Sequence, residues 1–224
     1  MNYYILANGE GKRWGNYKGV PKHLIEIDGE TLIDRTVRLL AKYRRKGDDI
    51  IICGPYQHPD AISWLTKSPT KREAFEEIAE HAGKVSFSIL YGDTYYTEAI
   101  IKDIIKRPID GFDEYISFGG NAYTGCQWNE GHVHRVADPE WFREQMAELN
   151  ACERIRDLDR GKDWFIHWWL LGARTMPELQ QKIFYASVEH DIIWYDETDD
   201  FDYPSDLDTF CKMTGHKCTN KEEA

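Results

Sequence analysis

The chain has 224 residues and a mass of 26.2 kDa, which is the size of one ordinary domain. Its net charge is -11 and its isoelectric point is about 5.2, so it lacks the excess of Lys and Arg that nucleic-acid binding requires, and we expect no nucleic-acid partner. No apolar run approaches the roughly 18 residues that cross a bilayer and no signal peptide is recognised, so we expect a cytoplasmic protein without a membrane partner. Five cysteines without framework or zinc-site spacing predict reduced thiols.

Short apolar runs and amphipathic stretches alternate through the first half of the chain. The predicted strands lie at 3–6, 48–55, 85–93 and 114–120. The predicted helices lie at 31–45, 58–66, 70–82 and 97–106, the third with a Thr70–Glu73 capping box. This alternation predicts an α/β fold with a mostly parallel central sheet and helices on both faces. Right-handed crossovers then bring the loops that follow the strands to one edge of the sheet, where ligands bind.

The second half of the chain is less regular. We expect a helix at 138–150, a buried aromatic helix at 162–173, a strand at 191–197, and an acidic loop followed by a short helix within 199–215, with Pro204 near its first turn. The polar tail from residue 216 is expected to fray. His132 and His134 alternate as on a strand, and because no third ligand lies nearby we favour an exposed strand face over a two-histidine metal edge.

The stretch "ILANGEGKRW" at 5–14 joins the first strand to an unusual loop. Gly9 and Gly11 let the backbone turn sharply and present N–H groups to an anion, and Lys12 and Arg13 add positive charge. The loop is not a dinucleotide fingerprint, because a tryptophan stands where the third glycine belongs, and it is not a Walker A loop, because the Gly-Lys pair is followed by Arg. Taken alone, it predicts either an anion-binding loop or an ordinary strand-to-helix turn.

A second motif, "PKHLIEIDGETLIDRTVRLL", begins eight residues after Arg13. Together the two stretches resemble the signature of the nucleotidyltransferases of GT-A-like fold, which include the sugar-1-phosphate nucleotidylyltransferases and the molybdopterin guanylyltransferase-like proteins. The residues that fit this signature in order are Leu6, Ala7, Gly9, Gly11, Arg13, Pro21, Lys22, Leu24 and Gly29. The resemblance covers about the first forty residues, and the rest of the chain is only weakly alike.

The resemblance implies a metal-dependent transfer from an NTP to a small phosphorylated acceptor, most often a sugar phosphate, with release of pyrophosphate. It implies one domain with a nucleotide-binding half at 1–125, an acceptor-binding half at 126–215 and a flexible tail at 216–224. The implied nucleotide-binding residues are Leu6, Ala7, Asn8, Gly9, Gly11, Lys12, Arg13 and Lys22. Arg13 and Lys22 would also be catalytic, offsetting charge on the phosphates as pyrophosphate leaves.

The negative charge in such a site implies a divalent cation, Mg²⁺ or Mn²⁺, held by one or two carboxylates. Asp93, in "ILYGD", fits the family's strand-end aspartate and would be both a metal ligand and a catalytic residue. Asp202, in "DDFDYPSDL", fits the second ligand, with Asp206 at the helix start. In a competing alignment "YISFGGN" is the central strand and Asn121 replaces the main carboxylate. We favour Asp93, because an aspartate at a strand end can hold the metal.

Two other functions stay open on the sequence alone. A GT-A-type glycosyltransferase would use the pair Asp200 and Asp202 for the metal of a nucleotide sugar, although that donor has no γ-phosphate for the glycine loop to hold. A non-catalytic nucleotide-binding module would keep the loop and lack the chemistry, as Asn121 at the central position would indicate. The base, the acceptor and the oligomeric state, a homo-oligomer included, are left open.

Overall fold

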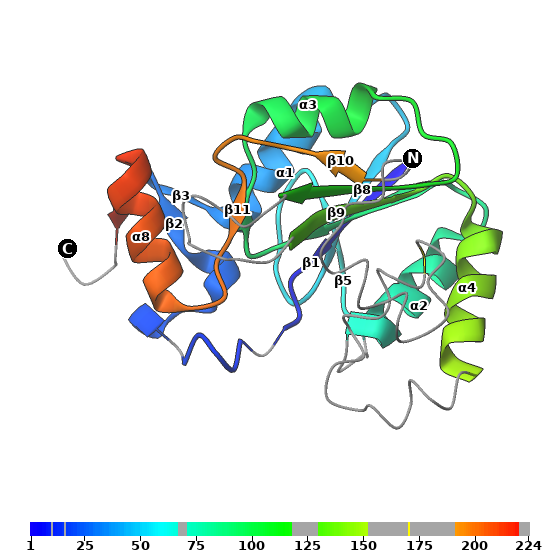
Figure 1. The fold of residues 1–224 in the computed structure, drawn as a ribbon, viewed down its shortest axis with the longest axis horizontal. Helices are drawn as coiled ribbons and strands as arrows, with labels where there is room; N and C mark the ends of the chain where they lie inside the picture. The colour runs from blue at the N-terminus through cyan, green and yellow to red at the C-terminus, as the bar shows by residue number, and fades with distance from the viewer. Residues whose placement is uncertain are drawn as a thin grey trace.

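A seven-stranded sheet forms the centre of the protein in this computed structural model, which describes residues 1–9, 11–15, 17–66, 71–117, 130–151, 170 and 191–219 (Figure 1). In order across the sheet, the strands are β10 (Asp191–Ile193), β8 (Phe112–Ser117), β9 (Glu130–Val136), β6 (Phe87–Tyr91), β1 (Asn2–Leu6), β4 (Asp49–Cys53) and β5 (Ile62–Trp64). β9 runs antiparallel to β6 and β8, and the other neighbouring strands pair in parallel. The predicted α/β fold with a mostly parallel sheet is therefore confirmed.

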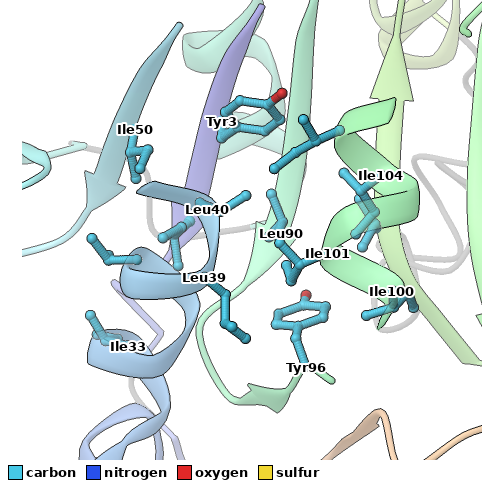
Figure 2. Close-up of a cluster of buried hydrophobic side chains, with 14 of the residues drawn as sticks. Tyr3, Ile33, Leu39, Leu40, Ile50, Leu90, Tyr96, Ile100, Ile101 and Ile104 are labelled. Carbon is cyan, nitrogen blue, oxygen red and sulfur yellow. The ribbon is translucent and has the colours of Figure 1, made fainter. Parts of the chain in front are cut away.

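Two pairs of helices cover the two faces of this sheet. One face carries α1 (Leu32–Tyr43) and α3 (Glu98–Lys106), and the other carries α2 (Lys71–Ala82) and α4 (Pro139–Ala151). Because side chains alternate along a strand, Tyr3 and Ile5 of β1 pack beneath α1 and α3, while Tyr4 packs on the α2 and α4 side. Figure 2 shows the first of these two cores, in which aliphatic side chains from both helices meet the strands.

The two helices of this face begin at threonine caps. The Thr31 hydroxyl accepts a hydrogen bond from the backbone N–H of Asp34 at 3.1 Å, and Thr97 accepts one from Ile100 at 3.3 Å. Each cap satisfies a backbone donor that the first helical turn leaves unpaired. The caps fix where α1 and α3 start: α1 directly follows the short strand β3 (Glu30–Thr31), and α3 begins three residues after the end of β7 (Thr94–Tyr95).

The C-terminal segment folds back against the N-terminal loops. β12 (Cys218–Thr219) pairs with β2 (Glu26–Ile27), which pairs with β3, and β11 (Asp199–Asp200) pairs with β7. Between them, α8 (Pro204–Thr214) packs into a third apolar cluster. The buried members of this cluster are Trp14, Ile25, Ile27, Leu32, Tyr95, Phe201, Leu207 and Phe210. Residues separated by most of the chain length therefore share one core.

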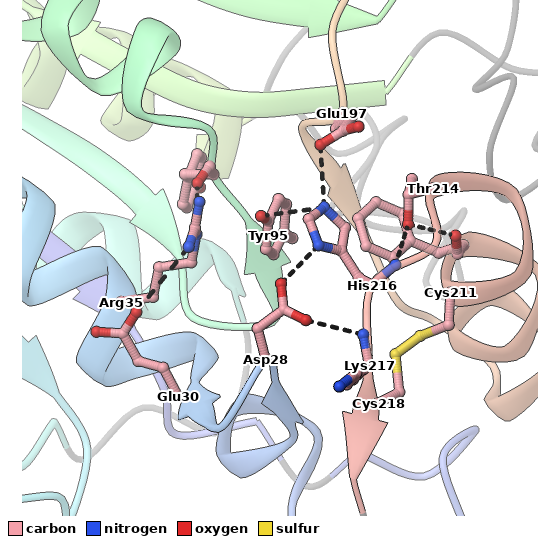
Figure 3. A network of polar contacts seen from close by, with 12 residues as sticks. Asp28, Glu30, Arg35, Tyr95, Glu197, Cys211, Thr214, His216, Lys217 and Cys218 are labelled. Atoms are coloured by element: carbon pink, nitrogen blue, oxygen red, sulfur yellow. Dashed lines mark hydrogen bonds and ion pairs between the residues drawn. A yellow bond between two sulfur atoms is a disulfide. The ribbon is translucent and has the colours of Figure 1, made fainter.

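Polar contacts reinforce this C-terminal attachment, as Figure 3 shows. The His216 ring lies between two carboxylates, with Nδ1 at 2.6 Å from Asp28 Oδ2 and Nε2 at 3.0 Å from Glu197 Oε2. The backbone N–H of Lys217 donates to Asp28 Oδ1 at 2.8 Å. The chain thus stays bound to the rest of the protein as far as β12, beyond residue 216, where a frayed tail was expected to begin.

The cysteine prediction is wrong at one pair. Cys211 of α8 and Cys218 of β12 are joined by a disulfide, with Cα atoms 6.2 Å apart. The pairing arises because the chain turns back after Gly215, which ends α8 in the left-handed conformation at φ 80°, and brings β12 beside the last helical turn. Cys53, at the end of β4, is a buried free thiol.

Other local predictions differ from the structure in definable ways. The helix predicted at 58–66 is wrong, because its second half contains β5. This edge strand pairs with the backbone groups on the outer side of β4. The acidic loop after 199 opens with the short strand β11. Thr70 and nearly all of 162–173 lie outside the described residues, so the capping box and the aromatic helix stay predictions. The strand predicted at 191–197 is shorter, because β10 ends at Ile193, and the other predicted strands and helices are present with slightly shifted ends. No helix in the described ranges is long and apolar enough to cross a membrane.

Candidate active site

The carboxyl end of β1 lies between two glycines, one after β4 and one after β6, and the candidate site begins there. A Cβ atom on Gly54 would lie 2.7 Å from the Ala7 carbonyl oxygen, and one on Gly92 would lie 2.6 Å from that of Leu6. Both distances are too short for any other residue, so glycine is required where β4 and β6 end. The Gly92 N–H also donates to Leu6 O at 2.8 Å. The close approach fixes Asp93, the next residue, beside the start of the glycine loop.

The loop after β1 is anchored at both of its ends. Asn8 Nδ2 donates to Thr66 Oγ1 at 2.5 Å, which ties the loop to the segment after β5. Gly11 adopts φ 57°, and the Trp14 N–H donates to Gly11 O at 2.9 Å to close a turn. The Trp14 indole is buried, and its Nε1–H lies 3.2 Å from the carbonyl oxygens of Tyr17 and Val20. The tryptophan that breaks the dinucleotide fingerprint is therefore the anchor of this loop.

A cavity of about 250 Å³ lies inside this loop. The predicted nucleotide-binding residues on its wall are Ala7, Asn8, Gly9, Gly11 and Lys22. Trp14, Pro55 and Tyr56 form further parts of the wall. The cavity wall thus combines glycines, rings and one lysine, which is a set of residues suited to an anionic ligand with a ring attached.

Lys22 stands at the centre of the charged part of the site. It follows Pro21, which opens a short 3₁₀ turn at Lys22–Leu24, and its side chain is largely buried, at 16% exposure. Its Nζ forms an ion pair with Asp93 and lies 3.3 Å from Asp202 Oδ1. Burial alone would lower the pKa of the Lys22 ammonium, but the charges of Asp93 and Asp202 outweigh it, so the pKa is raised. Lys22 is therefore a charged group held between two carboxylates.

Arg13 contacts one of these two carboxylates, Asp202, from the solvent side. Its Nη1 lies 2.5 Å from Asp202 Oδ2, and its guanidinium stands over the Tyr203 ring at 5.6 Å from the centroid. Asp202 therefore uses one oxygen for Lys22 and the other for Arg13. Asp206, at the start of α8, accepts from the Tyr203 N–H at 2.6 Å, which is the helix-start role expected of it.

The structure brings together four of the charged residues that the sequence singled out: Arg13, Lys22, Asp93 and Asp202. Asn121, the rival for the central position, lies outside the described residues. β8, which leads toward it, is separated from β1 by β6 and β9, whereas β6, which leads to Asp93, pairs with β1 directly. Lys12 adjoins Arg13 in the loop.

The two carboxylates suit a hard dication. Asp93 and Asp202 both contact a single cationic atom, Lys22 Nζ, so the two carboxylates face the same charged group. Mg²⁺ is commonly held by one or two carboxylates together with phosphates and water. Within the described part of the chain, no group of three or more His, Cys, Asp or Glu side chains could hold a metal. A metal here would therefore draw its remaining ligands from substrate and solvent.

The expectation for His132 and His134 is wrong, because both side chains are buried, at 2% exposure. Their strand, β9, lies inside the sheet between β6 and β8 and is covered on both faces. Burial lowers the pKa of His134 well below its usual value, and the ring makes a 2.7 Å contact from Nε2 to the Tyr91 hydroxyl. These histidines are part of the protein interior.

Three supporting residues escaped the sequence analysis. Tyr56 OH lies 2.7 Å from Nε2 of His23, the neighbour of Lys22, and burial lowers the pKa of His23 to about 4. Tyr96 OH accepts from the Tyr91 N–H at 2.9 Å and donates to the His132 carbonyl at 2.7 Å, which braces the turn that carries Asp93. Thr66 holds the glycine loop. Nothing in the sequence marks them, because each acts through a contact between distant segments.

Comparisons with known proteins identify the family and the fold. The family model of the MobA-like NTP transferase domain matches residues 3–162. Among solved structures, a protein assigned as a glucose-1-phosphate thymidylyltransferase from Bacillus anthracis aligns with a TM-score of 0.58 at 14% identity, over 95% of this chain and 94% of that one. The CTP:phosphocholine cytidylyltransferase from Streptococcus pneumoniae aligns with a TM-score of 0.57 at 13% identity, over 95% and 98%. At these identities the likeness shows a shared fold. No match was found among curated proteins.

Proposed function

The chain belongs to the family of the MobA-like NTP transferase domain. From this we propose that it transfers a nucleotidyl group from an NTP to a small phosphorylated acceptor, and we propose a sugar phosphate as that acceptor. The observation that carries the proposal is the convergence of Arg13, Lys22, Asp93 and Asp202 beside the glycine loop. This pairing of cations with carboxylates suits a polyphosphate and its metal ion.

The proposed reaction forms one bond and breaks one. An oxygen of the acceptor phosphate attacks the α-phosphorus of the NTP, and the bond from that phosphorus to the bridging oxygen of the pyrophosphate breaks. The electron pair leaves with pyrophosphate, and the acceptor keeps the nucleoside monophosphate. The protein contributes in-line positioning and charge stabilisation, because no covalent intermediate is needed.

Each part of the site has a role in this proposal. The turn at Gly9 and Gly11 would bind the phosphates through backbone N–H groups, and Lys22 and Arg13 would offset the charge that develops on the leaving pyrophosphate. Asp93 and Asp202 would hold a divalent cation, Mg²⁺ or Mn²⁺, which when bound supplies further stabilisation of phosphate charge. The loop favours an NTP over a nucleotide sugar as donor, because only the NTP carries a γ-phosphate.

Pyrophosphate release is the test of this proposal. The protein is incubated with each of the four common NTPs, with Mg²⁺ or Mn²⁺, and with a panel of phosphorylated acceptors. The panel contains hexose 1-phosphates and phosphocholine, because the solved structures of similar fold include transferases named for such acceptors. We expect release with at least one pair of substrates, and a much slower release by Asp93→Asn at the same metal concentration. Asp60→Asn, at an exposed loop position, is the matched control. NTP binding without release for any acceptor would contradict transfer and favour a binding module.

A further inference from the structure

The ammonium group of Lys22 occupies the place that a metal ion would take. It contacts Asp93 from the turn after β6 and Asp202 from the segment between β11 and α8. An ion that bound both Asp93 and Asp202 would meet the same oxygens. A dication and the Lys22 ammonium cannot share this small space, because like charges a few ångströms apart repel strongly where solvent screening is reduced.

The lysine is also needed where it stands. Asp93 and Asp202 are only 18% and 30% exposed, so two bare carboxylates here would repel one another in a partly buried setting. Lys22 neutralises that repulsion in the absence of any ligand. It therefore adds an ionic contact to the pairing of β11 with β7, which already holds the segment before α8 against the turn after β6.

A second place for the ammonium lies next to the first. Lys22 is on the wall of the cavity that also contains Gly9 and Gly11, where the proposed function puts the phosphates of an NTP. Lysine has a long flexible stem that can move its charge from one anion to another. Phosphate groups in the cavity would compete with the two carboxylates for the same ammonium.

We propose that Lys22 is an exchangeable cation: it excludes a divalent metal from Asp93 and Asp202 in the free protein, and releases the two carboxylates when phosphates draw its charge into the cavity. This inference rests on the proposed function for the identity of the phosphates. It makes metal and nucleotide binding mutually dependent beyond the affinity of the metal for the nucleotide itself, because a coupling between two sites is reciprocal. The protein would then bind free metal weakly, and would bind the metal tightly only together with a nucleotide.

The test measures Mn²⁺ binding without nucleotide, by the loss of the free-ion signal in electron paramagnetic resonance. Lys22→Met and Lys22→Gln remove the charge and should tighten Mn²⁺ binding by roughly tenfold or more, the usual size of such couplings. Lys22→Arg should keep the weak binding of the wild type. Lys102→Met, which removes an exposed ammonium from α3, is the matched control and should change nothing. Adding Asp93→Asn to Lys22→Gln should abolish the gain and thereby locate the ion.

A second arm measures inorganic triphosphate binding by calorimetry in a metal-free buffer. Both neutral variants should bind it about tenfold more weakly, and Lys102→Met should bind it as the wild type does. The inference stands only if the variants gain Mn²⁺ and lose triphosphate. Unchanged Mn²⁺ affinity, a gain that survives Asp93→Asn, or undiminished triphosphate binding would each overturn it. Neither arm uses catalysis, so a failure of the exchange is separate from a failure of pyrophosphate release.

Discussion

Asp202 Oδ1 lies 3.3 Å from Lys22 Nζ, although the two residues are 180 positions apart in the chain. The contact joins the loop after β1 to the segment before α8. It is reinforced by Arg13 on the other carboxylate oxygen and by the apolar cluster around Trp14 and Phe201. The candidate site is therefore completed by the C-terminal segment, and its chemistry can be tested from both sides of this contact.

Arg13→Met should separate activity from stability. The ion pair between Arg13 and Asp202 is 60% exposed on the arginine side, so we expect the free energy of unfolding to change by less than about 1 kcal/mol. Pyrophosphate release should fall roughly 100-fold, because a donor to the developing charge is lost. Urea unfolding and the release assay measure the two effects. Arg38→Met, which breaks an exposed pair with Glu30, is the control, and an equal loss of activity there would contradict a specific role for Arg13.

Gly92→Ala and Gly9→Ala form a matched pair of substitutions in the same site. The added Cβ at Gly92 meets the Leu6 carbonyl oxygen at 2.6 Å, whereas nothing lies within 4 Å at Gly9. We expect Gly92→Ala to lower the free energy of unfolding by about 2 kcal/mol and Gly9→Ala to change it by less than about 0.5 kcal/mol. Thermal unfolding checks this order. Similar melting temperatures for the two variants would show that β1 does not need the close approach.

Acid should destabilise the fold in part through His23. Burial lowers the pKa of His23 from 6.5 to about 4, so between these values the unfolded chain binds a proton that the folded protein does not. The free energy of unfolding should therefore fall as the pH drops from about 6.5 to 4, by at most about 3 kcal/mol from this group. Urea unfolding in His23→Gln should show a shallower pH dependence over this window. The slope should not vanish, because burial also lowers the pKa of His132 and His134. Identical slopes would contradict the prediction.

Reduction should loosen the C-terminal segment. The disulfide between Cys211 and Cys218 closes a short loop with a sequence separation of 7, for which the chain-entropy estimate is about 2 kcal/mol. We expect dithiothreitol to lower the melting temperature of the wild type and to leave Cys211→Ser/Cys218→Ser unchanged. Thiol counting under denaturing conditions, before and after reduction, provides the independent check. A count that reduction does not raise would refute the bond.

Removal of divalent metal should abolish pyrophosphate release. Chelation with EDTA is expected to stop the reaction, and added Mg²⁺ or Mn²⁺ to restore it. In Asp93→Asn the metal concentration for half-maximal activity should rise roughly 10-fold or more, because the variant loses a charged ligand. Asp60→Asn should match the wild type. Full activity in EDTA would leave the carboxylate pair without its proposed role.

Most of the site residues that the sequence could predict belong to local motifs. Glycines at 9 and 11, a proline before Lys22 and a strand-end Gly-Asp are patterns of neighbouring residues, so they can be interpreted without a fold. Their convergence with Asp202 was predicted through the resemblance and not through any local pattern. The residue roles at Asp93 and Asp202 stay predictions until the assays above are made.

What the sequence could not predict depends on contacts between distant segments. β5 was expected to be helical, since its short run "ISW" has no strong pattern of its own. It is a strand because it pairs with the outer edge of β4. His132 and His134 were expected to be exposed because nothing in "GHVHRV" reveals that β9 lies between two other strands. The disulfide, likewise, depends on a chain reversal at Gly215.

The placement of Asp202 also has a consequence for biosynthesis. A ribosome that has released only the first half of the chain has delivered Lys22 and Asp93, but neither Asp202 nor α8, which covers Trp14 and Leu32. The nascent N-terminal half therefore carries an exposed apolar patch and one bare ion pair instead of a finished site. The carboxylate pair that is proposed to hold the metal is therefore complete only once nearly the whole chain has been translated, whereas the residues that line the cavity, from Ala7 to Tyr56, are all delivered early.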